Sequence, residues 1–437
     1  MRTIPGSATQ YGLMCFDANG AERSDPDVRG GAMSRRLLEA AAGGDITNIF
    51  LFSHGWMGDV PAAVDQYDRW IGAVDTLAAD REKASRIFPG FRPLYIGLHW
   101  PSLPWGEEEL GDASFAAGEE APGPEELYRL YLDRLGDTPA ARSALRSILD
   151  EAARNAAPGH LPPNVRDAFL DLNQALELGS DGVGGAPDAD REPFDPEAAF
   201  EGEGVAFGGF DVFGGILGLL RLCSYWNMKK RARTVGEGGM HAFVNSLQRA
   251  APAARIHLMG HSFGCVVISS ILGGPQAAGT FERPIDSVVL AQGAVSLWSY
   301  APQIPIPGVG PGYFHKVLPG GKVRGPLVTT QSRYDTAVGS LYPKASTISG
   351  EVAFDVEELP KYGAIGTFGL QGLPGEVQRD TSMLPDTGEY EFERGKVYNL
   401  EASRFISKGT GSSGAHNDID GPEVAHAIWQ AAFASAS

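Results

Sequence analysis

Short apolar runs alternate along the chain with stretches of helical periodicity. The runs suited to buried strands are 46–52, 93–99, 255–259, 287–291 and 326–330, with 396–405 as a further candidate. Helical patterns lie between several of them, notably at 229–250, 263–272 and 422–433. This alternation predicts an α/β fold with a mainly parallel sheet and helices on both faces. In such sheets the chemistry lies in the loops that follow the strands.

One segment departs from the alternation and also carries most of the charge. Residues 105–210 hold 23 Asp and Glu against seven Arg and no Lys, a net −16 of the chain's total of −18. Helical patterns near 125–135, 140–155 and 164–178 predict a helical insertion with an acidic, solvated surface. The following stretch, 179–205, is rich in Gly, Pro and acids, and predicts a long loop or a disordered link.

These patterns divide the 437 residues into three parts. We expect residues 1–100 and 229–437 to form the two parts of one α/β core, and 101–228 to form an acidic cap inserted after an early strand. Since the remaining 331 residues are close to neutral, the charge says little about a substrate. The acidic balance does argue against nucleic acid and anionic membranes as partners.

The cysteines and the N-terminus bear on the compartment. Cys15, Cys223 and Cys265 lie far apart and form no CxxC pair, which argues against a disulfide framework and a thiolate zinc site. The first residues have no apolar core typical of a signal peptide, and the most apolar run, 212–223, is too short to span a bilayer. We therefore expect a soluble, cytoplasmic protein without an integral membrane segment.

The loop after the strand at 255–259 contains a pattern typical of a nucleophilic serine. Residues 260–264 read Gly-His-Ser-Phe-Gly, a G-x-S-x-G pattern between an apolar strand and an apolar helix. A serine on a sharp strand-to-helix turn projects its hydroxyl, and small residues two before and two after let strand and helix approach closely. The short pattern alone can arise by chance in a glycine-rich chain, so its position between strand and helix carries the prediction that Ser262 is a nucleophile.

A serine hydroxyl needs a base, which an acid then orients. Of nine histidines, His416 lies in a late loop between the strand candidate at 396–405 and the final helical pattern, where a triad base is needed. Asp335 follows the strand at 326–330 and completes the order Ser262, Asp335, His416. Asp355 is the main alternative to Asp335 as the acid. The strand at 287–291 is followed by AQGAVSLW, which offers no carboxylate.

An oxyanion hole needs backbone N–H groups aimed at the developing charge. One is expected from Phe263, the residue after the nucleophile. The second is expected from Trp56, in the loop Ser-His-Gly-Trp that follows the strand at 46–52.

Taken together, these loops resemble the serine-hydrolase branch of the α/β-hydrolase superfamily. The resemblance covers 46–100 and about 229–435, with HGW, GHSFG, RYD and AHND in the expected order. It implies Ser262 as nucleophile, His416 as base, Asp335 as acid, and the Trp56 and Phe263 amides as oxyanion donors. The insertion lies earlier than the usual cap position, and the segment between Asp335 and His416 is long. No metal or cofactor is implied.

Substrate contacts are expected from the insertion and from the aromatic, Pro-rich loop 296–316. For 212–226 a buried helix is favoured over a lid that opens on a lipid surface. For the basic cluster Lys229, Lys230, Arg231 and Arg233 a solvated helix face is favoured over a clamp for an acidic group.

The predicted function is hydrolysis of carboxylic esters, from small-molecule to lipid-like, through an acyl-enzyme. The alternatives are an interfacial lipase or polyesterase, an amidase or thioesterase with the same machinery, and a non-catalytic binding protein on a hydrolase scaffold. No HExxH, P-loop or strand-linked GxGxxG occurs, and a serine at residue 262 argues against hydrolases that use a carboxylate nucleophile.

Overall fold

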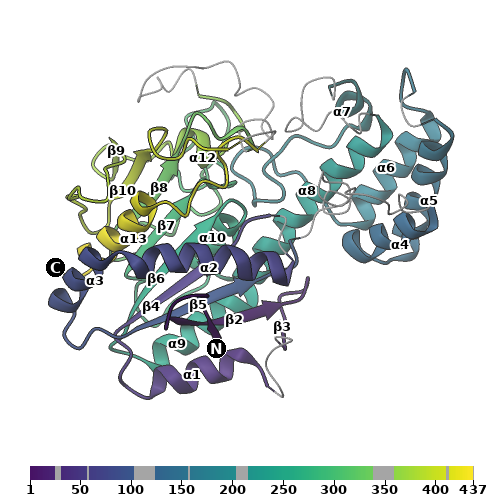
Figure 1. The fold of residues 1–437 in the computed structure, drawn as a ribbon. Coiled ribbons are helices and arrows are strands. Elements are labelled where there is room, and N and C mark those ends of the chain that lie inside the picture. The colour runs from purple at the N-terminus through teal and green to yellow at the C-terminus, as the bar shows by residue number, and fades with distance from the viewer. Residues whose placement is uncertain are drawn as a thin grey trace.

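The structure is a computed structural model of the chain. It describes residues 1–24, 31–56, 59–102, 124–155, 158–202, 215–337, 359–409 and 413–436. In this part of the chain helices surround one central sheet, and a group of helices extends to one side (Figure 1).

The sheet is mixed, ten-stranded and mainly parallel, which confirms the predicted α/β class. Its strands are β1 (Arg2–Thr3), β2 (Gln10–Phe16), β3 (Glu22–Arg23), β4 (Asn48–Ser53), β5 (Pro93–His99), β6 (Arg255–His261), β7 (Ser287–Ala291), β8 (Leu327–Gln331), β9 (Gln378–Ser382) and β10 (Val397–Glu401). Their order is β1-β2-β5-β4-β6-β7-β8-β10-β9, and β3 pairs with β2. β1 and β3 run antiparallel to β2. All other neighbouring pairs in this order, from β2 across the sheet to β9, are parallel.

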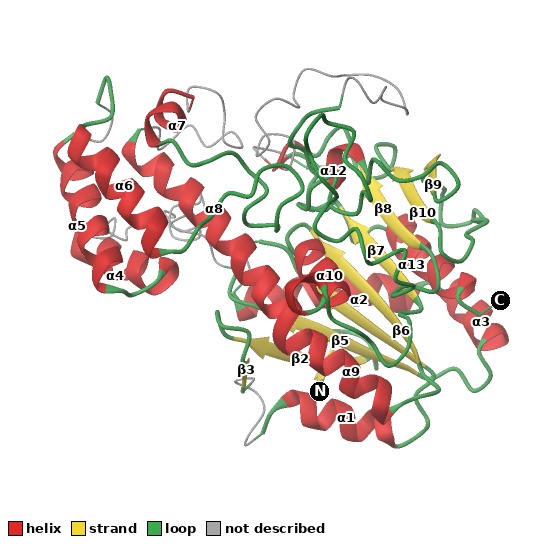
Figure 2. Cartoon of the chain, turned by 180° about the vertical axis from the view of Figure 1, so that it is seen from behind, coloured by secondary structure: helices red, strands yellow, loops and turns green. Residues whose placement is uncertain are grey.

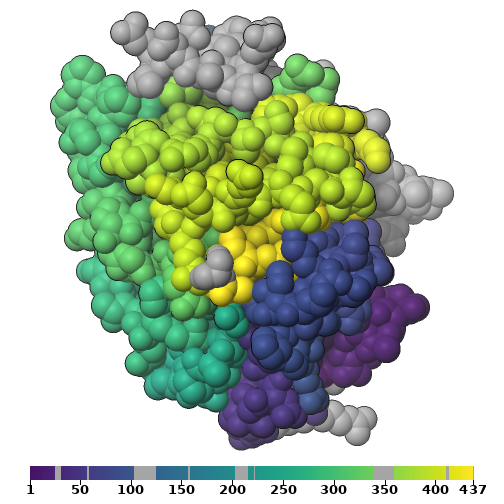
Figure 3. Space-filling model, turned by 90° about the vertical axis from the view of Figure 1, so that its left-hand side faces the viewer, coloured from purple at the N-terminus to yellow at the C-terminus, as the bar shows by residue number. Residues whose placement is uncertain are grey.

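Helices cover both faces of this sheet, as the alternation predicts (Figure 2). On one face lie α2 (Val60–Thr76), α3 (Ala78–Ile87) and α13 (Pro422–Ala434). On the other lie α1 (Met33–Ala42), α8 (Ile216–Val235), α9 (His241–Ala250) and α10 (Gly264–Gly273), with short helical turns at η1 (Gly236–Met240), η2 (Pro275–Ala277) and α12 (Ile365–Phe368). Figure 3 shows the C-terminal helix, in yellow, against the blue helices of the first hundred residues.

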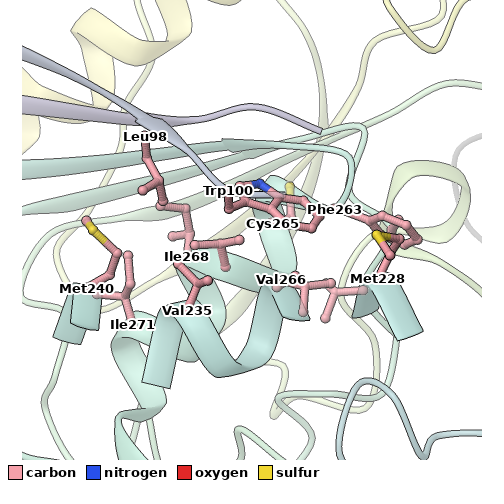
Figure 4. Close-up of a cluster of buried hydrophobic side chains, with 14 of the residues drawn as sticks. Leu98, Trp100, Met228, Val235, Met240, Phe263, Cys265, Val266, Ile268 and Ile271 are labelled. Carbon is pink, nitrogen blue, oxygen red and sulfur yellow. The ribbon is translucent and has the colours of Figure 1, made fainter. Parts of the chain in front are cut away.

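The core beneath the second face holds the helix that follows the candidate nucleophile. Figure 4 shows Cys265, Val266, Ile268 and Ile271 of α10 among buried side chains of α8, η1 and β5. All ten residues of α10 are buried, so the helix is fixed on every side. Such packing holds the turn before α10 in one conformation.

The predicted strands match six observed ones, with small differences at their ends. The candidate at 396–405 is a strand only over Val397–Glu401, because a turn begins at Ala402 with Phe405 and Ile406 donating N–H bonds back to its carbonyl. The helical pattern at 229–250 is interrupted by the π-helical turn η1, where Gly236 lets the chain pass close to α10. The sequence pattern does not predict strands β1, β2, β3 and β9.

A group of helices follows β5, in the segment predicted to be an insertion. The predicted helices correspond to α4 (Pro124–Leu135), α5 (Pro139–Arg154) and α6 (Pro163–Ala175), and α7 (Pro196–Gly202) is additional. They pack on one another and on α8, beside the sheet (Figures 1 and 2). α8 spans both sides of the boundary placed at 228/229, and the three-part division stays a prediction. Within 216–226 the described side chains are mostly buried, in agreement with the buried-helix interpretation of 212–226; residues 212–214 lie outside the described part.

The basic cluster on α8 is not the solvated face that the sequence pattern favours. Lys229 is buried, Arg233 pairs with buried Asp188, and Arg231 donates to the carbonyl of Arg134. Because helices of the insertion pack against α8, Lys229 is buried and the other cations are partly buried, so they take acidic or carbonyl partners. Lys230 likewise bonds to Glu177.

For residues 179–202 the structure shows a packed loop and a short helix instead of a disordered link. Asp188, Asp190 and Arg191 are buried there, and the Arg191 guanidinium donates to the carbonyl of Gly179. This stretch has few apolar residues, so ion pairs and hydrogen bonds of its buried charged side chains hold it in place. Residues 203–205 lie outside the described part.

No helix in the described ranges has the length and apolar character needed to cross a membrane.

Candidate active site

Ser262 occupies a strained turn between β6 and α10. Its φ is 55°, in the left-handed region that non-glycine residues rarely adopt. A side chain on Gly264 would collide with the carbonyl oxygens of Ser53 and His54, so a glycine is required where α10 passes β4. The Ser262 N–H donates to the carbonyl of Ala291 at 3.1 Å, which fixes the turn from the neighbouring strand β7. This is the strand-to-helix turn predicted from the G-x-S-x-G pattern.

The structure brings Ser262, His416 and Asp335 together in one hydrogen-bonded chain. The Ser262 Oγ lies 2.7 Å from His416 Nε2, and His416 Nδ1 lies 2.8 Å from Asp335 Oδ2. The three residues Ser262, His416 and Asp335 are 5%, 8% and 3% exposed, so this chain of bonds is largely shielded from water. With the proton on Nδ1, His416 donates to the carboxylate and presents an unprotonated Nε2 to the serine hydroxyl.

The three side chains come from segments that follow three strands of the sheet. Ser262 directly follows β6, Asp335 follows β8, and His416 lies in the loop after β10. The last two loops are joined because the Ala415 N–H donates to the carbonyl of Tyr334 at 2.8 Å. Residues far apart in the chain thus converge at the carboxyl ends of parallel strands.

The loop after β4 lies directly against the nucleophile. A Cβ on Gly55 would come within 2.7 Å of the Ser262 Cβ, so only glycine permits this approach. The His54 ring Nδ1 lies 2.8 Å from the Gly55 carbonyl oxygen and donates to it. In a trans peptide the N–H of the next residue points away from that carbonyl, so this bond sets the direction of the Trp56 amide.

The second expected donor residue, Phe263, begins the turn into α10 and is buried. Its ring centroid lies 5.5 Å from that of Trp56. The side chains of Trp56 and Phe263 are therefore in contact beside the turn that carries Ser262; that their amides form an oxyanion hole stays a prediction. Met57 and Gly58, which complete the loop after β4, lie outside the described residues.

Two further histidines next to the site are kept neutral. Burial, with the nearby His416, lowers the pKa of His261 to about 3, and burial together with His99 lowers the pKa of His54 to about 3. His261 can therefore act as a neutral hydrogen-bonding group: its Nε2 lies 2.9 Å from the backbone carbonyl of His416, and its Nδ1 lies 3.1 Å from the Gln66 amide nitrogen. The ring thus holds the loop that carries the candidate base.

The alternative residues have other surroundings. Asp355, the rival acid, lies outside the described part of the chain. Asp418 accepts two backbone N–H bonds from residues 407 and 408, and Asp420 forms an exposed pair with Arg69. His257 is held within the sheet by Ser287 and Asn48, while His426 pairs with Asp80. These contacts are typical of structural roles.

Sequence reasoning missed Gln292, which lies immediately after β7. Its side-chain amide Nε2 donates to Asp335 Oδ2 at 2.9 Å, and the residue is fully buried. The sequence after this strand draws no attention, because it offers no carboxylate. What points to Gln292 is that β7 lies between β6 and β8, the strands that lead to Ser262 and Asp335. This follows only from the strand order in the sheet.

The aromatic loop 296–316 packs tightly beside this region. Leu297, Trp298 and Ile304 form a small buried cluster with Phe368 of α12. The Trp298 indole donates to the carbonyl of Pro360 at 3.2 Å, which ties the loop to the segment after the acid. Buried apolar contacts and this hydrogen bond thus hold the loop against α12 and the segment after the acid; that it is stiff and contacts substrate stays a prediction.

The described residues contain no group of three or more His, Cys, Asp or Glu arranged to hold a metal ion. The three cysteines are buried and unbridged. Comparison of the chain with protein-family models, with curated proteins and with solved structures finds no significant match. Function is therefore inferred from the geometry of the site itself.

Proposed function

We propose that this protein is a serine hydrolase of the α/β-hydrolase superfamily that cleaves carboxylic esters through an acyl-enzyme. The observation that carries the proposal is the continuous chain of hydrogen bonds from Asp335 through His416 to Ser262. Two further features support it: the strained turn at Ser262, and a glycine-containing loop held against the nucleophile.

In the first half-reaction the Ser262 Oγ attacks the ester carbonyl carbon while His416 Nε2 takes the hydroxyl proton. The carbonyl oxygen becomes an oxyanion, which the Trp56 and Phe263 amides stabilise. When the tetrahedral intermediate collapses, the bond to the leaving alkoxide breaks and the proton on His416 passes to it. The products of this half are an alcohol and the Ser262 acyl ester.

In the second half-reaction water takes the place of the alcohol. His416 removes a proton from the water as its oxygen attacks the acyl carbon, and a second oxyanion forms at the same amides. Collapse returns the proton from His416 to the Ser262 Oγ and releases the carboxylic acid. Throughout, Asp335 keeps the imidazole in the tautomer that leaves Nε2 free and stabilises the imidazolium that forms.

The proposal is tested by the turnover of p-nitrophenyl esters of increasing acyl length. Wild-type protein should release p-nitrophenol catalytically, and Ser262→Ala should reduce kcat by about 10⁵–10⁶-fold, as losses of a triad serine do. The matched control is Ser270→Ala on α10, because the Ser270 hydroxyl is buried and makes no hydrogen bond within the described residues. Full turnover by Ser262→Ala, or none by the wild type over esters, thioesters and amides, would refute the proposal.

A further inference from the structure

Two non-glycine residues with positive φ follow neighbouring strands at this edge of the sheet. Ser262 follows β6 with a φ of 55°, and Gln292 follows β7 with a φ of 45°. Backbone strain of this kind persists where the surroundings hold it in place. At Ser262 the strain belongs to the sharp strand-to-helix turn that carries the candidate nucleophile.

Gln292 is held at its backbone and at both ends of its side chain. Its N–H donates to the Thr330 hydroxyl at 3.0 Å, and that hydroxyl donates to Gln292 Oε1 at 2.9 Å. The amide nitrogen faces two acceptors, Asp335 Oδ2 at 2.9 Å and the carbonyl of Gly366 at 3.4 Å. A flipped amide would place Oε1 against a carboxylate, so these four contacts define its orientation.

Residues 291–294, the segment around Gln292, also form hydrogen bonds with the backbone of the candidate nucleophile. The Ser262 N–H donates to the carbonyl of Ala291, and the Ala294 N–H donates to the carbonyl of Ser262, each at 3.1 Å. β7 lies between β6 and β8, the strands that lead to Ser262 and to Asp335. Residues 291–294 therefore connect the backbone of the nucleophile to the side chain of the acid.

We infer that Gln292 is a positioning residue for the proposed reaction, which acts by holding the Asp335 carboxylate against His416. The inference rests on the proposed function. Asp335 Oδ2 accepts both the Gln292 N–H and the His416 Nδ1–H, so the amide fixes the oxygen that orients the imidazole. A neutral donor also solvates the carboxylate charge where water is largely excluded, without competing for the proton of His416.

The test compares Gln292→Met with a matched control in the ester assay. Methionine keeps the length of the side chain but removes both polar ends, and we expect kcat to fall about 10–100-fold, the range typical of outer-shell partners, with KM nearly unchanged. The control is Gln248→Met, at the other end of the strands, where a buried amide exchanges two hydrogen bonds with the backbone of Arg283. It should keep wild-type kcat even though it loses comparable contacts.

A double-mutant cycle separates a role through Asp335 from a general loss of packing. In the Asp335→Asn background, Gln292→Met should lower kcat less than about threefold, because the carboxylate it holds is gone. Equal losses in both backgrounds would overturn the inference. Full kcat in Gln292→Met alone would overturn it while leaving the proposed function intact, whereas a wild type without any turnover contradicts the proposed function itself.

The pH profile of Gln292→Glu gives a second readout. Two carboxylates in contact share one proton, and the introduced carboxyl group, while it is protonated, can donate to Asp335 as the amide does. The titratable groups that the described hydrogen bonds bring to this cluster are Asp335, His416 and His261. We expect this variant to lose activity on the alkaline side, where wild type is on a plateau, as the shared proton leaves. A profile parallel to wild type would contradict the role.

Discussion

Replacing Asp335 with asparagine leaves the size of the side chain unchanged and removes the charge that, in the proposed mechanism, stabilises the protonated base. The Asp335 Oδ2 lies 2.8 Å from His416 Nδ1, and both side chains are largely buried. In the proposed reaction His416 becomes an imidazolium next to this carboxylate when Ser262 attacks. At about 4 Å between charge centres and an effective dielectric constant of about 20, the attraction is worth about 4 kcal/mol. We therefore expect kcat to fall about 10³-fold, since each 1.36 kcal/mol is a factor of ten.

The assay is steady-state ester hydrolysis by wild type and Asp335→Asn, with thermal unfolding to show that the variant is folded. KM should change little, because the lost interaction develops only as the serine is attacked. The control is Asp420→Asn, which alters an exposed pair with Arg69 and should leave kcat unchanged. A loss below tenfold in Asp335→Asn would contradict the role of Asp335 as the acid, and a large loss in Asp355→Asn instead would assign that role to Asp355.

Three further outcomes are expected. His54→Ala frees the Gly55 carbonyl, which sets the direction of the Trp56 amide, the proposed oxyanion donor, so kcat should fall about 10²-fold at constant KM in the same assay. Arg233→Met leaves Asp188 buried without its partner and should cost about 3–5 kcal/mol in urea unfolding, whereas adding Asp188→Asn should restore most of the stability. Burial lowers the pKa of His426, but its bonds to Asp80 and to the backbone outweigh this and raise it above 6.5. The stabilisation by this pair is thus present below pH 6.5 and lost as the pH rises through the folded-state pKa of His426. The melting temperature of Asp80→Asn should therefore lie below that of wild type by an amount that shrinks with rising pH. A difference in melting temperature that does not depend on pH would contradict this.

The strands and loops that could be predicted share one property: their signals are local. The core strands are continuous apolar runs because helices bury both faces of the sheet, and Ser262 lies within a short pattern bounded by such a strand and a helix. Asp335 and His416 could be placed because the order of strands and loops along the chain sets which loops meet at one edge.

What could not be predicted depends on contacts between distant segments. The role of Gln292 depends on the order β6, β7, β8 in space, since its partner Asp335 lies 43 residues further along the chain. The cations of α8 look like a solvated face in a linear pattern, and only the packing of the insertion encloses them. Strand β2, near the N-terminus, pairs with β5 across about 80 residues, and β9 is a short, partly exposed edge strand of polar residues.

The assignment of Ser262 as the nucleophile is tested most directly by reaction with a fluorophosphonate, followed by measurement of the mass of the protein and of its peptides. If the proposed triad operates, one adduct per chain forms on Ser262, is absent in Ser262→Ala and forms far more slowly in His416→Ala, because the serine reacts when His416 Nε2 accepts its proton. An adduct retained in Ser262→Ala, or a wild type that does not react, would contradict the assignment of Ser262 as an activated nucleophile.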